Sequence, residues 1–343
     1  MSTLSEAYGD YPIPSDITPL DFNSIDKVPE THIWSQPDLQ THQYHPQDPI
    51  IPVIDLTDPN AIDQIRQACE TLGMFQVINH GVPSVLVNKV ESEIRRLFGL
   101  PIQEKCKVLR SPTGATGYGT ARISPFYDKG MWHEGFTIMG SCLDDAKTLW
   151  PHDFQGFCDT MDAFQNQMKL LAHNLLRLIF QSLDATQEEI NWATSSHGSQ
   201  GALQLNSYPS CPNPDGTLGL AAHTDTLLLT LLHQGGGVNG LEIFVEGSGW
   251  TPVKPVEDGF VVNLGDLMHI FSNSKFPVVY HRVMVNQSKQ RISAAYFCGP
   301  PVESVVAPSS KFRNPCFRPL VVKEYISLKA KHFNKALSLI GQE

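Results

Sequence analysis

The fold and the chemistry of this chain are most clearly indicated by one short stretch, residues 220–226, which reads LAAHTDT. Within it, His223 and Asp225 are two residues apart. If the stretch is a β-strand, both side chains leave the same face, because side chains alternate across a strand. An imidazole and a carboxylate on one face are two of the three ligands of the triad that holds non-haem Fe(II). A lone His-x-Asp pair is more often structural, so the prediction depends on a third ligand elsewhere in the chain.

A third ligand and an anion-binding pair occur in two further apolar runs. The run VVYHRV contains His281, and the run QRISA places Arg291 and Ser293 on a shared face. A guanidinium beside a hydroxyl suits a carboxylate, which an Arg fork binds with two parallel hydrogen bonds. The order of these motifs predicts an iron held by His223, Asp225 and His281, next to a site for a dicarboxylate cosubstrate.

Another metal and other residues compete with this triad. Zinc accepts the same ligands, but a zinc site gives no reason for the neighbouring Arg-x-Ser pair. Asp266 is the competing carboxylate, and because it follows a strand-like run and a glycine it is interpreted as a turn or supporting residue. His80, in the sequence NHG, is predicted to be a turn residue because no second ligand lies near it.

Composition excludes several classes of function. The chain has 343 residues and a net charge of -10, with no long basic run, so neither a nucleic acid nor a membrane is expected as its partner. Its seven cysteines form no Cys-x-x-Cys pair, and the first ten residues lack the features of a signal sequence. We therefore expect reduced thiols and a cytoplasmic location.

The first 200 residues mix helix and strand patterns. Residues 1–48 are predicted to form an irregular arm with a short helix at 15–22, and the region 111–151 lacks periodicity but is rich in aromatic residues. Apolar residues from Phe157 to Leu183 recur at helical spacing, which predicts a long amphipathic helix. Short strands are predicted at 51–56 and 74–78, helices after Asn60 and from Ser84, and a capping box at Thr186–Glu189.

From residue 201 to 298 the chain consists of short apolar runs separated by glycine-rich turns. This pattern is typical of a β-sandwich or barrel. The runs are 202–208, 227–232, 241–245, 260–264, 267–271, 278–285 and 292–297. Apolar residues between Tyr325 and Ile340 then predict a closing helix.

Several motifs make the chain resemble the plant 2-oxoglutarate and Fe(II)-dependent dioxygenases over nearly its whole length. Besides the runs around the triad, they are NHGVP at 79–83, NSYPSCP at 206–212 and NLGD at 263–266. Within that superfamily the chain most resembles the gibberellin 3-oxidases. The segments that point there are KGMWHEGFTI at 129–138, LGLAAHTD at 218–225 and HFNKALS at 332–338.

The resemblance implies a fold that is mainly β with α. Its centre is a double-stranded β-helix (jelly-roll) core backed by the long helix, after an α/β N-terminal region. It divides the chain into an N-terminal region with the arm and a substrate-pocket loop, 1–200, the jelly-roll core that holds iron and 2-oxoglutarate, 201–300, and a C-terminal loop with a closing helix, 301–343.

The resemblance also implies the reaction: hydroxylation of a gibberellin, a diterpenoid, at C-3 through an Fe(IV)-oxo species, with release of succinate and CO2. The cofactors are Fe(II), 2-oxoglutarate and O2, with ascorbate as a further candidate. Arg291 is the catalytic-site residue that binds 2-oxoglutarate, with Ser293, and Tyr208 is a third candidate by family match. A gibberellin 2-oxidase, a dioxygenase of flavonoids or other small molecules, and a non-catalytic jelly-roll binding protein are the alternatives.

Four residues are candidates for substrate contact. Trp132 and Phe136 belong to the aromatic-rich region, which is interpreted as a pocket wall. Phe297 follows Arg291 at an even spacing, so it can face the same cavity. A gibberellin carries a carboxylate, and Arg122 is a candidate partner for it, although a surface arginine explains the residue equally well.

Overall fold

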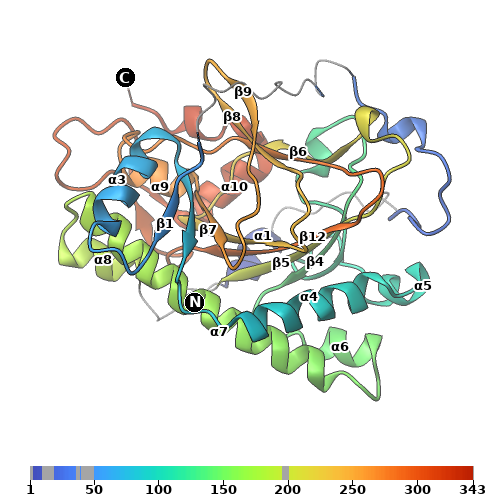
Figure 1. The fold of residues 1–343 in the computed structure, drawn as a ribbon. Coiled ribbons are helices and arrows are strands. Elements are labelled where there is room, and N and C mark those ends of the chain that lie inside the picture. The colour runs from blue at the N-terminus through green and yellow to red at the C-terminus, as the bar shows by residue number, and fades with distance from the viewer. Residues whose placement is uncertain (1–2, 10–18, 36–38, 40–49, 195–200, 343) are drawn as a thin grey trace.

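Two β-sheets form the centre of the computed structural model, which describes residues 3–9, 19–35, 39, 50–194 and 201–342 (Figure 1). The larger sheet has eight strands, in the order β1 (Val53–Asp55), β2 (Met74–Ile78), β10 (Phe260–Leu264), β7 (Leu229–Gly235), β12 (Arg291–Cys298), β5 (Ala202–Tyr208), β4 (Glu134–Ile138) and β3 (Gly117–Gly119). The smaller sheet has the order β6 (Leu218–His223), β11 (His281–Met284), β8 (Leu241–Val245) and β9 (Gly249–Pro252). A short pair joins β13 (Val305–Val306) to β14 (Leu320–Val321).

Helices cover the outer face of the larger sheet, and further helices lie near the two ends of the chain. They are α1 (Leu4–Gly9), α3 (Ala61–Thr71), α4 (Ser84–Phe98), α5 (Ile102–Lys105), α6 (Leu143–Leu149), α7 (Gln155–Ser182), α8 (Gln187–Ala193), α9 (Asp266–Phe271) and α10 (Val322–His332). Short 3-10 turns lie at Glu30–His32, Cys106–Val108, Ser124–Phe126, Pro214–Gly216, Phe333–Lys335 and Leu337–Leu339. Within the described residues, no helix is both long enough and apolar enough to span a bilayer.

Side-chain alternation separates the two faces of the larger sheet. On β12, Ile292, Ala294 and Tyr296 pack into the core beneath the helices. Ala295 instead joins the cluster between the two sheets, which also contains Val283 of the smaller sheet. Arg291, Ser293 and Phe297 share the face of Ala295, because they are an even number of residues from it. The inner face of β12 therefore presents polar groups at one end and an aromatic ring at the other.

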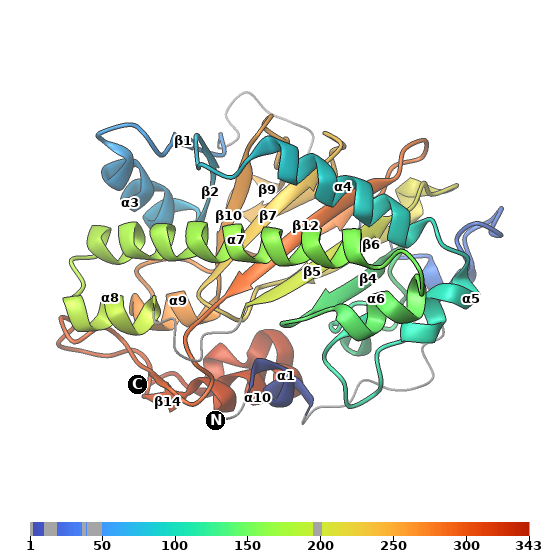
Figure 2. The ribbon, with the colours of Figure 1, turned by 90° about the horizontal axis from the view of Figure 1, so that it is seen from below.

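The long amphipathic helix predicted from the sequence is confirmed as α7. Its 28 residues run along the outer face of the larger sheet, beside α4 (Figure 2). The predicted capping box at the start of α8 is also confirmed: the hydroxyl of Thr186 accepts from Glu189 N at 3.2 Å, and Thr186 N donates to the Glu189 carboxylate at 2.8 Å. The helices of the outer layer thus support the larger sheet, whose opposite, inner face carries the polar residues of β12.

Two sequence-based predictions differ from the structure. The apolar run 267–271, predicted among the strands, is part of helix α9. Four of its residues are buried and only His269 is polar, and a mostly apolar run of this length does not distinguish a short buried helix from a strand. The region 111–151 is not irregular throughout: it contains β3, β4 and α6, and the strand β4 pairs with β5 in the larger sheet.

The two ends of the chain meet. Helix α1 packs against α10, with Leu4 and Ala7 buried in the main core (Figure 2). In the N-terminal arm, the sequence pattern predicts a helix at 15–22 and not the observed α1. Of that span only 19–22 are described, and they are not helical. The division at residues 200 and 300 stays a prediction.

Candidate metal and cosubstrate site

Two histidines face each other across strands β6 and β11. His223 is the last residue of β6, His281 is the first of β11, and the antiparallel register pairs them directly. The Nδ1 atom of His223 lies 2.8 Å from the carbonyl oxygen of Ala221, and that of His281 lies 3.1 Å from the carbonyl oxygen of Val279. A carbonyl oxygen can only accept, so Nδ1 carries the proton in both rings. The Nε2 lone pairs are therefore left for a metal.

The carboxylate of Asp225 completes the cluster. Its Oδ1 atom lies 3.9 Å from Nε2 of His223 and 3.8 Å from Nε2 of His281, and one ligand atom of each residue lies within 4.8 Å of the others. Its other oxygen accepts a hydrogen bond from the hydroxyl of Thr230 at 2.6 Å. Strand β6 ends before Asp225, whose position is set by a backbone hydrogen bond from Asp266 N to its carbonyl oxygen.

These residues fit a non-haem Fe(II) ion. Two imidazoles and one carboxylate are its usual protein ligands, and they leave other positions of the ion open. Burial, followed by the proximity of His281, lowers the pKa of His223, so its ring is neutral and ready to ligate near pH 7. His223 and Asp225 border a cavity of about 330 Å³, which gives small molecules access to the site.

Arg291 lies on the inner face of β12, directly opposite Tyr208 on β5. Its side chain is 1 % exposed, and its carbon Cζ lies 5.2 Å from the centre of the Tyr208 ring. Its Nη2 donates to the amide oxygen of Gln234 at 3.1 Å, whereas Nε and Nη1 have no hydrogen-bond partner among the described residues. Buried donors without a partner are costly, so this guanidinium is prepared for an anion that the protein itself does not supply.

Ser293 extends this polar face by one pleat. It is buried, lies opposite Asn206 in the register of β12 and β5, and its hydroxyl accepts from the Asn206 amide at 3.2 Å. The amide oxygen of Asn206 lies 2.9 Å from Nε2 of His133. The unpartnered Nε and Nη1 donors of Arg291 and the adjacent hydroxyl of Ser293 fit the distal carboxylate of a short dicarboxylate such as 2-oxoglutarate.

The structure brings two of the four predicted substrate residues to the cavity. Phe297 and Arg122 both line it. Trp132 instead packs edge-on against Phe22, with 4.8 Å between ring centres, and Phe136 is fully buried in the main core. The reason lies in strand β4: its alternate residue Thr137 faces the cavity, so Phe136 points to the opposite side.

A buried ion pair lies behind the metal-ligand segment. The competing carboxylate Asp266 lies outside the metal cluster, is fully buried, and accepts from Lys329 Nζ and from the Tyr325 hydroxyl, each at 2.7 Å. The Lys329 amine also donates to the hydroxyl of Thr224, between two of the ligands. Helix α10 thus fixes the segment that carries His223 and Asp225.

Several of these supporting residues were missed by sequence reasoning. Thr230 and Gln234 carried a usable signal, because they are polar, four residues apart and therefore on one face of the apolar strand β7. Tyr325 and Lys329 carried none, since a tyrosine and a lysine one helical turn apart are common on helix surfaces.

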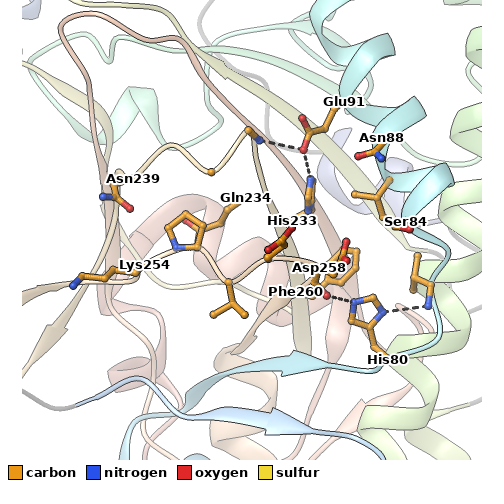
Figure 3. A pocket seen from close by; sticks show the side chains of 18 residues that line it. His80, Ser84, Asn88, Glu91, His233, Gln234, Asn239, Lys254, Asp258 and Phe260 are labelled. Atoms are coloured by element: carbon orange, nitrogen blue, oxygen red, sulfur yellow. Dashed lines mark hydrogen bonds and ion pairs between the residues drawn. The ribbon is translucent and has the colours of Figure 1, made fainter.

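A second cavity, of about 720 Å³, opens elsewhere on the surface, between the start of α4 and the residues around β10 (Figure 3). There His233 and Glu91 form an ion pair at 2.8 Å. His80, interpreted from sequence as a turn residue, lies 2.8 Å from the carbonyl oxygen of Asp258 and 3.1 Å from the amide nitrogen of Val82. Both of its ring nitrogens are thus used within the protein, and none of the three metal-ligand candidates lines this cavity.

Comparison with known proteins agrees with this geometry. Two family models match the chain. The model of the 2OG-Fe(II) oxygenase superfamily matches residues 199–300. A second model, described as the N-terminal region of non-haem dioxygenase in morphine synthesis, matches residues 51–154. The chain is 46 % identical over 352 aligned residues to gibberellin 3-beta-dioxygenase 1 of Pisum sativum, covering 99 % of this chain and 94 % of that protein. It is 44 % identical to gibberellin 3-beta-dioxygenase 3 of Arabidopsis thaliana, covering 99 % of each.

A solved structure supports the fold as well. The crystal structure of JOX2 in complex with 2OG, Fe and JA superposes with a TM-score of 0.81 at 26 % identity, covering 93 % of this chain and 95 % of that one. The jelly-roll fold expected from the sequence is thereby confirmed, as are Fe(II) and 2-oxoglutarate as cofactors and a dioxygenase as the class of enzyme. The chain therefore belongs to the 2OG-Fe(II) oxygenase superfamily and, within it, to the family of the gibberellin 3-beta-dioxygenases.

Proposed function

We propose that this enzyme hydroxylates a gibberellin at C-3, with His223, Asp225 and His281 as its iron ligands. The observation that carries the substrate is the 44–46 % identity, over nearly the full length, to relatives named gibberellin 3-beta-dioxygenases. The observation that carries the ligands is the His-Asp-His cluster beside the cavity, in which Asp225 and His281 are buried. Iron, when bound, supplies the oxidising power that no amino acid has, coupling 2-oxoglutarate decarboxylation to insertion of oxygen into a C–H bond.

The protein residues bind and orient the reactants. In this proposal Arg291 donates two hydrogen bonds to the distal carboxylate of 2-oxoglutarate, and Ser293 donates a third. Tyr208, opposite Arg291 in the sheet, forms the wall beside the cosubstrate. Its hydroxyl stays protonated, because burial raises its pKa to about 12.

The substrate lies in the adjoining cavity, against apolar walls that include Phe297 and Leu220. A largely apolar cavity keeps water from the reacting centre and holds a rigid diterpenoid in one orientation. The orientation decides which carbon is hydroxylated, because a misplacement of about one ångström at the reacting centre can cost about a hundredfold in rate.

The experiment is turnover of a panel of gibberellin precursors. Enzyme loaded anaerobically with Fe(II) receives 2-oxoglutarate, O2 and one precursor, and products are analysed by mass spectrometry and NMR. We expect a product heavier by one oxygen atom, formed with matching succinate and hydroxylated at C-3. Omission of ascorbate from parallel reactions tests its role as a further cofactor.

Other outcomes separate the alternatives. A hydroxyl at C-2 would make the enzyme a 2-oxidase, and turnover only with a flavonoid or another small molecule would remove the gibberellin assignment. Succinate formation without any hydroxylated gibberellin would retain the iron chemistry alone. Absence of both iron and turnover would favour a binding protein with the same fold.

We also propose that the enzyme works in the cytosol. All seven cysteines are unpaired, including the neighbouring Cys142 and Cys158, whose sulfur atoms are 4.0 Å apart. Unpaired thiols are typical of a reducing compartment. A fluorescent fusion that co-localised with an organelle marker would contradict the proposal.

A further inference from the structure

Two arginines line the same cavity as the metal ligands. Arg110 precedes β3 and Arg122 follows it, and the side chains of both line the cavity. Arg110 donates to the hydroxyl of Thr137 at 3.3 Å and to the carbonyl oxygen of Thr120. Both acceptors are neutral. Among the described residues, Arg110 forms no ion pair with a carboxylate.

Among the described residues of the cavity wall, no group balances the charge of Arg110. The one carboxylate among those residues is Asp225, and it belongs to the metal cluster. Lys329 also lines the cavity, but Asp266 neutralises it at 2.7 Å. A guanidinium taken out of water without a counter-ion destabilises the folded protein, so the arrangement has a cost that a bound anion would remove.

Arg122 is held in place beside this charge. It donates to the carbonyl oxygens of Gly114 at 3.1 Å and of Tyr8 at 2.8 Å, and its carbon Cζ lies 5.0 Å from the centre of the Tyr8 ring. Burial, and then the positive charge of Arg122, lower the pKa of Arg110 to about 10. The charge of Arg122 therefore disfavours the charged form of Arg110, and an anion in contact with both guanidiniums would offset this repulsion.

We infer that Arg110, with Arg122 beside it, binds the carboxylate of the substrate in this cavity. The inference rests on the proposed function, because it takes the substrate to be a gibberellin acid. The cosubstrate has a separate site, where the unpartnered donors of Arg291 lie on the inner face of β12. The cavity arginines therefore select an anionic substrate and orient it, while the apolar wall that includes Phe297 packs against its skeleton.

The role of Arg110 can be tested by comparing a gibberellin acid with its methyl ester, which has the same skeleton without the charge. Each is titrated calorimetrically into anaerobic enzyme loaded with Fe(II) and 2-oxoglutarate, so that binding is measured without turnover. The wild-type enzyme should bind the acid at least about tenfold more tightly than the ester, because a desolvated charge pair is lost in the ester.

In Arg110→Gln, the dissociation constant of the acid should rise about thirtyfold or more, and the acid and the ester should then bind about equally. Ester affinity should change little. The matched control is Arg177→Gln, which removes the same charge from an exposed position on α7. It should retain the wild-type preference for the acid. If Arg110→Gln kept the same preference, the inference would be overturned.

Two further results decide the remaining cases. If Arg110→Gln does not fold, Arg110→Lys replaces it: loss of the planar fork should weaken acid binding about tenfold and leave the ester unaffected, and unchanged acid binding would overturn the inference. If the wild-type enzyme bound neither the acid nor the ester, the proposed function would fail, and this inference would fail with it.

Discussion

His281 lies directly opposite His223 on the neighbouring antiparallel strand, with 4.2 Å between the ring centres. The two residues are far apart in sequence, so this contact depends entirely on the pairing of β6 with β11. A slip of one residue in that register would turn one ring to the opposite face of the sheet. The register of the smaller sheet is therefore what assembles the metal cluster.

Replacement of His281 by Ala should abolish iron binding. The variant keeps only one imidazole and one carboxylate, too few ligands to hold Fe(II) against water. Metal analysis of protein purified with anaerobic Fe(II) should give background iron in His281→Ala and in Asp225→Ala. The exposed His152 provides the control, since His152→Ala should bind iron normally. Full iron content in either triad variant would show that the ligands are wrong.

Thr230→Val should weaken iron binding without unfolding the protein. Its hydroxyl donates to one oxygen of Asp225 at 2.6 Å and so keeps the other oxygen directed at the histidines. Loss of such a supporting hydrogen bond typically costs about 10–100-fold in metal affinity. Competition with a chelator measures the change, and Thr71→Val, on the surface of α3, is the matched substitution. Equal affinities in the two variants would exclude this role.

Arg291→Ala should raise the KM for 2-oxoglutarate at least tenfold, because truncating one partner of a desolvated charge pair costs about 2–5 kcal/mol. Arg291→Lys should have an intermediate effect, since an ammonium keeps the charge but not the fork. Steady-state kinetics with varied 2-oxoglutarate at saturating substrate give both values. An unchanged KM in Arg291→Ala would refute the assignment of the cosubstrate site.

Lys329→Met should destabilise the protein by about 3–5 kcal/mol, because it leaves the carboxylate of Asp266 buried and unpaired. The double variant Lys329→Met with Asp266→Asn should recover much of that loss, since no buried charge then remains. Urea unfolding of the single and double variants measures both free energies. A loss no larger than that of an exposed pair, about 1 kcal/mol, would mean that the pair is not buried in solution.

The ion pair between Glu91 and His233 should make stability depend on acid pH. The hydrogen bond from His233 is the main cause that lowers the pKa of Glu91 from its ordinary value of 4.5. A carboxyl with a lowered pKa in the folded state contributes stability that is complete above its ordinary pKa and is lost as the pH falls through the lowered value. Unfolding free energies measured between about pH 6 and pH 3 should therefore fall less steeply in Glu91→Gln than in the wild type. Parallel curves would show that the pair has no effect.

Prediction from the sequence succeeded for structural features that depend only on residues close together in the chain. The amphipathic stripe of α7 and the capping box at Thr186 are local features, and both are confirmed. Patterns also failed for identifiable reasons. The run 267–271 has a single polar residue, His269, among four apolar ones, which is too little to establish a period that distinguishes helix from strand. Phe136, proposed from sequence as a pocket residue, lies in the main core instead, because its aromatic character is visible in the sequence while the face it occupies is not.

By itself, the sequence determined the kinds of ligand and the order in which they occur. His-x-Asp, a distant His and Arg-x-Ser are chemical identities, and the shared face of Arg291 and Ser293 follows from the alternation of side chains along a strand. Only the tertiary structure decided which side chains meet: the register that pairs His223 with His281, the hydrogen bond from Thr230 to Asp225, and the unbalanced charge of Arg110 at the cavity. The register and the position of Arg110 depend on contacts between distant segments, because the pairing of strands and the packing of helices set distances that no local pattern contains. The hydrogen bond from Thr230 to Asp225 joins residues that are close in sequence, and it depends on the turn between β6 and β7.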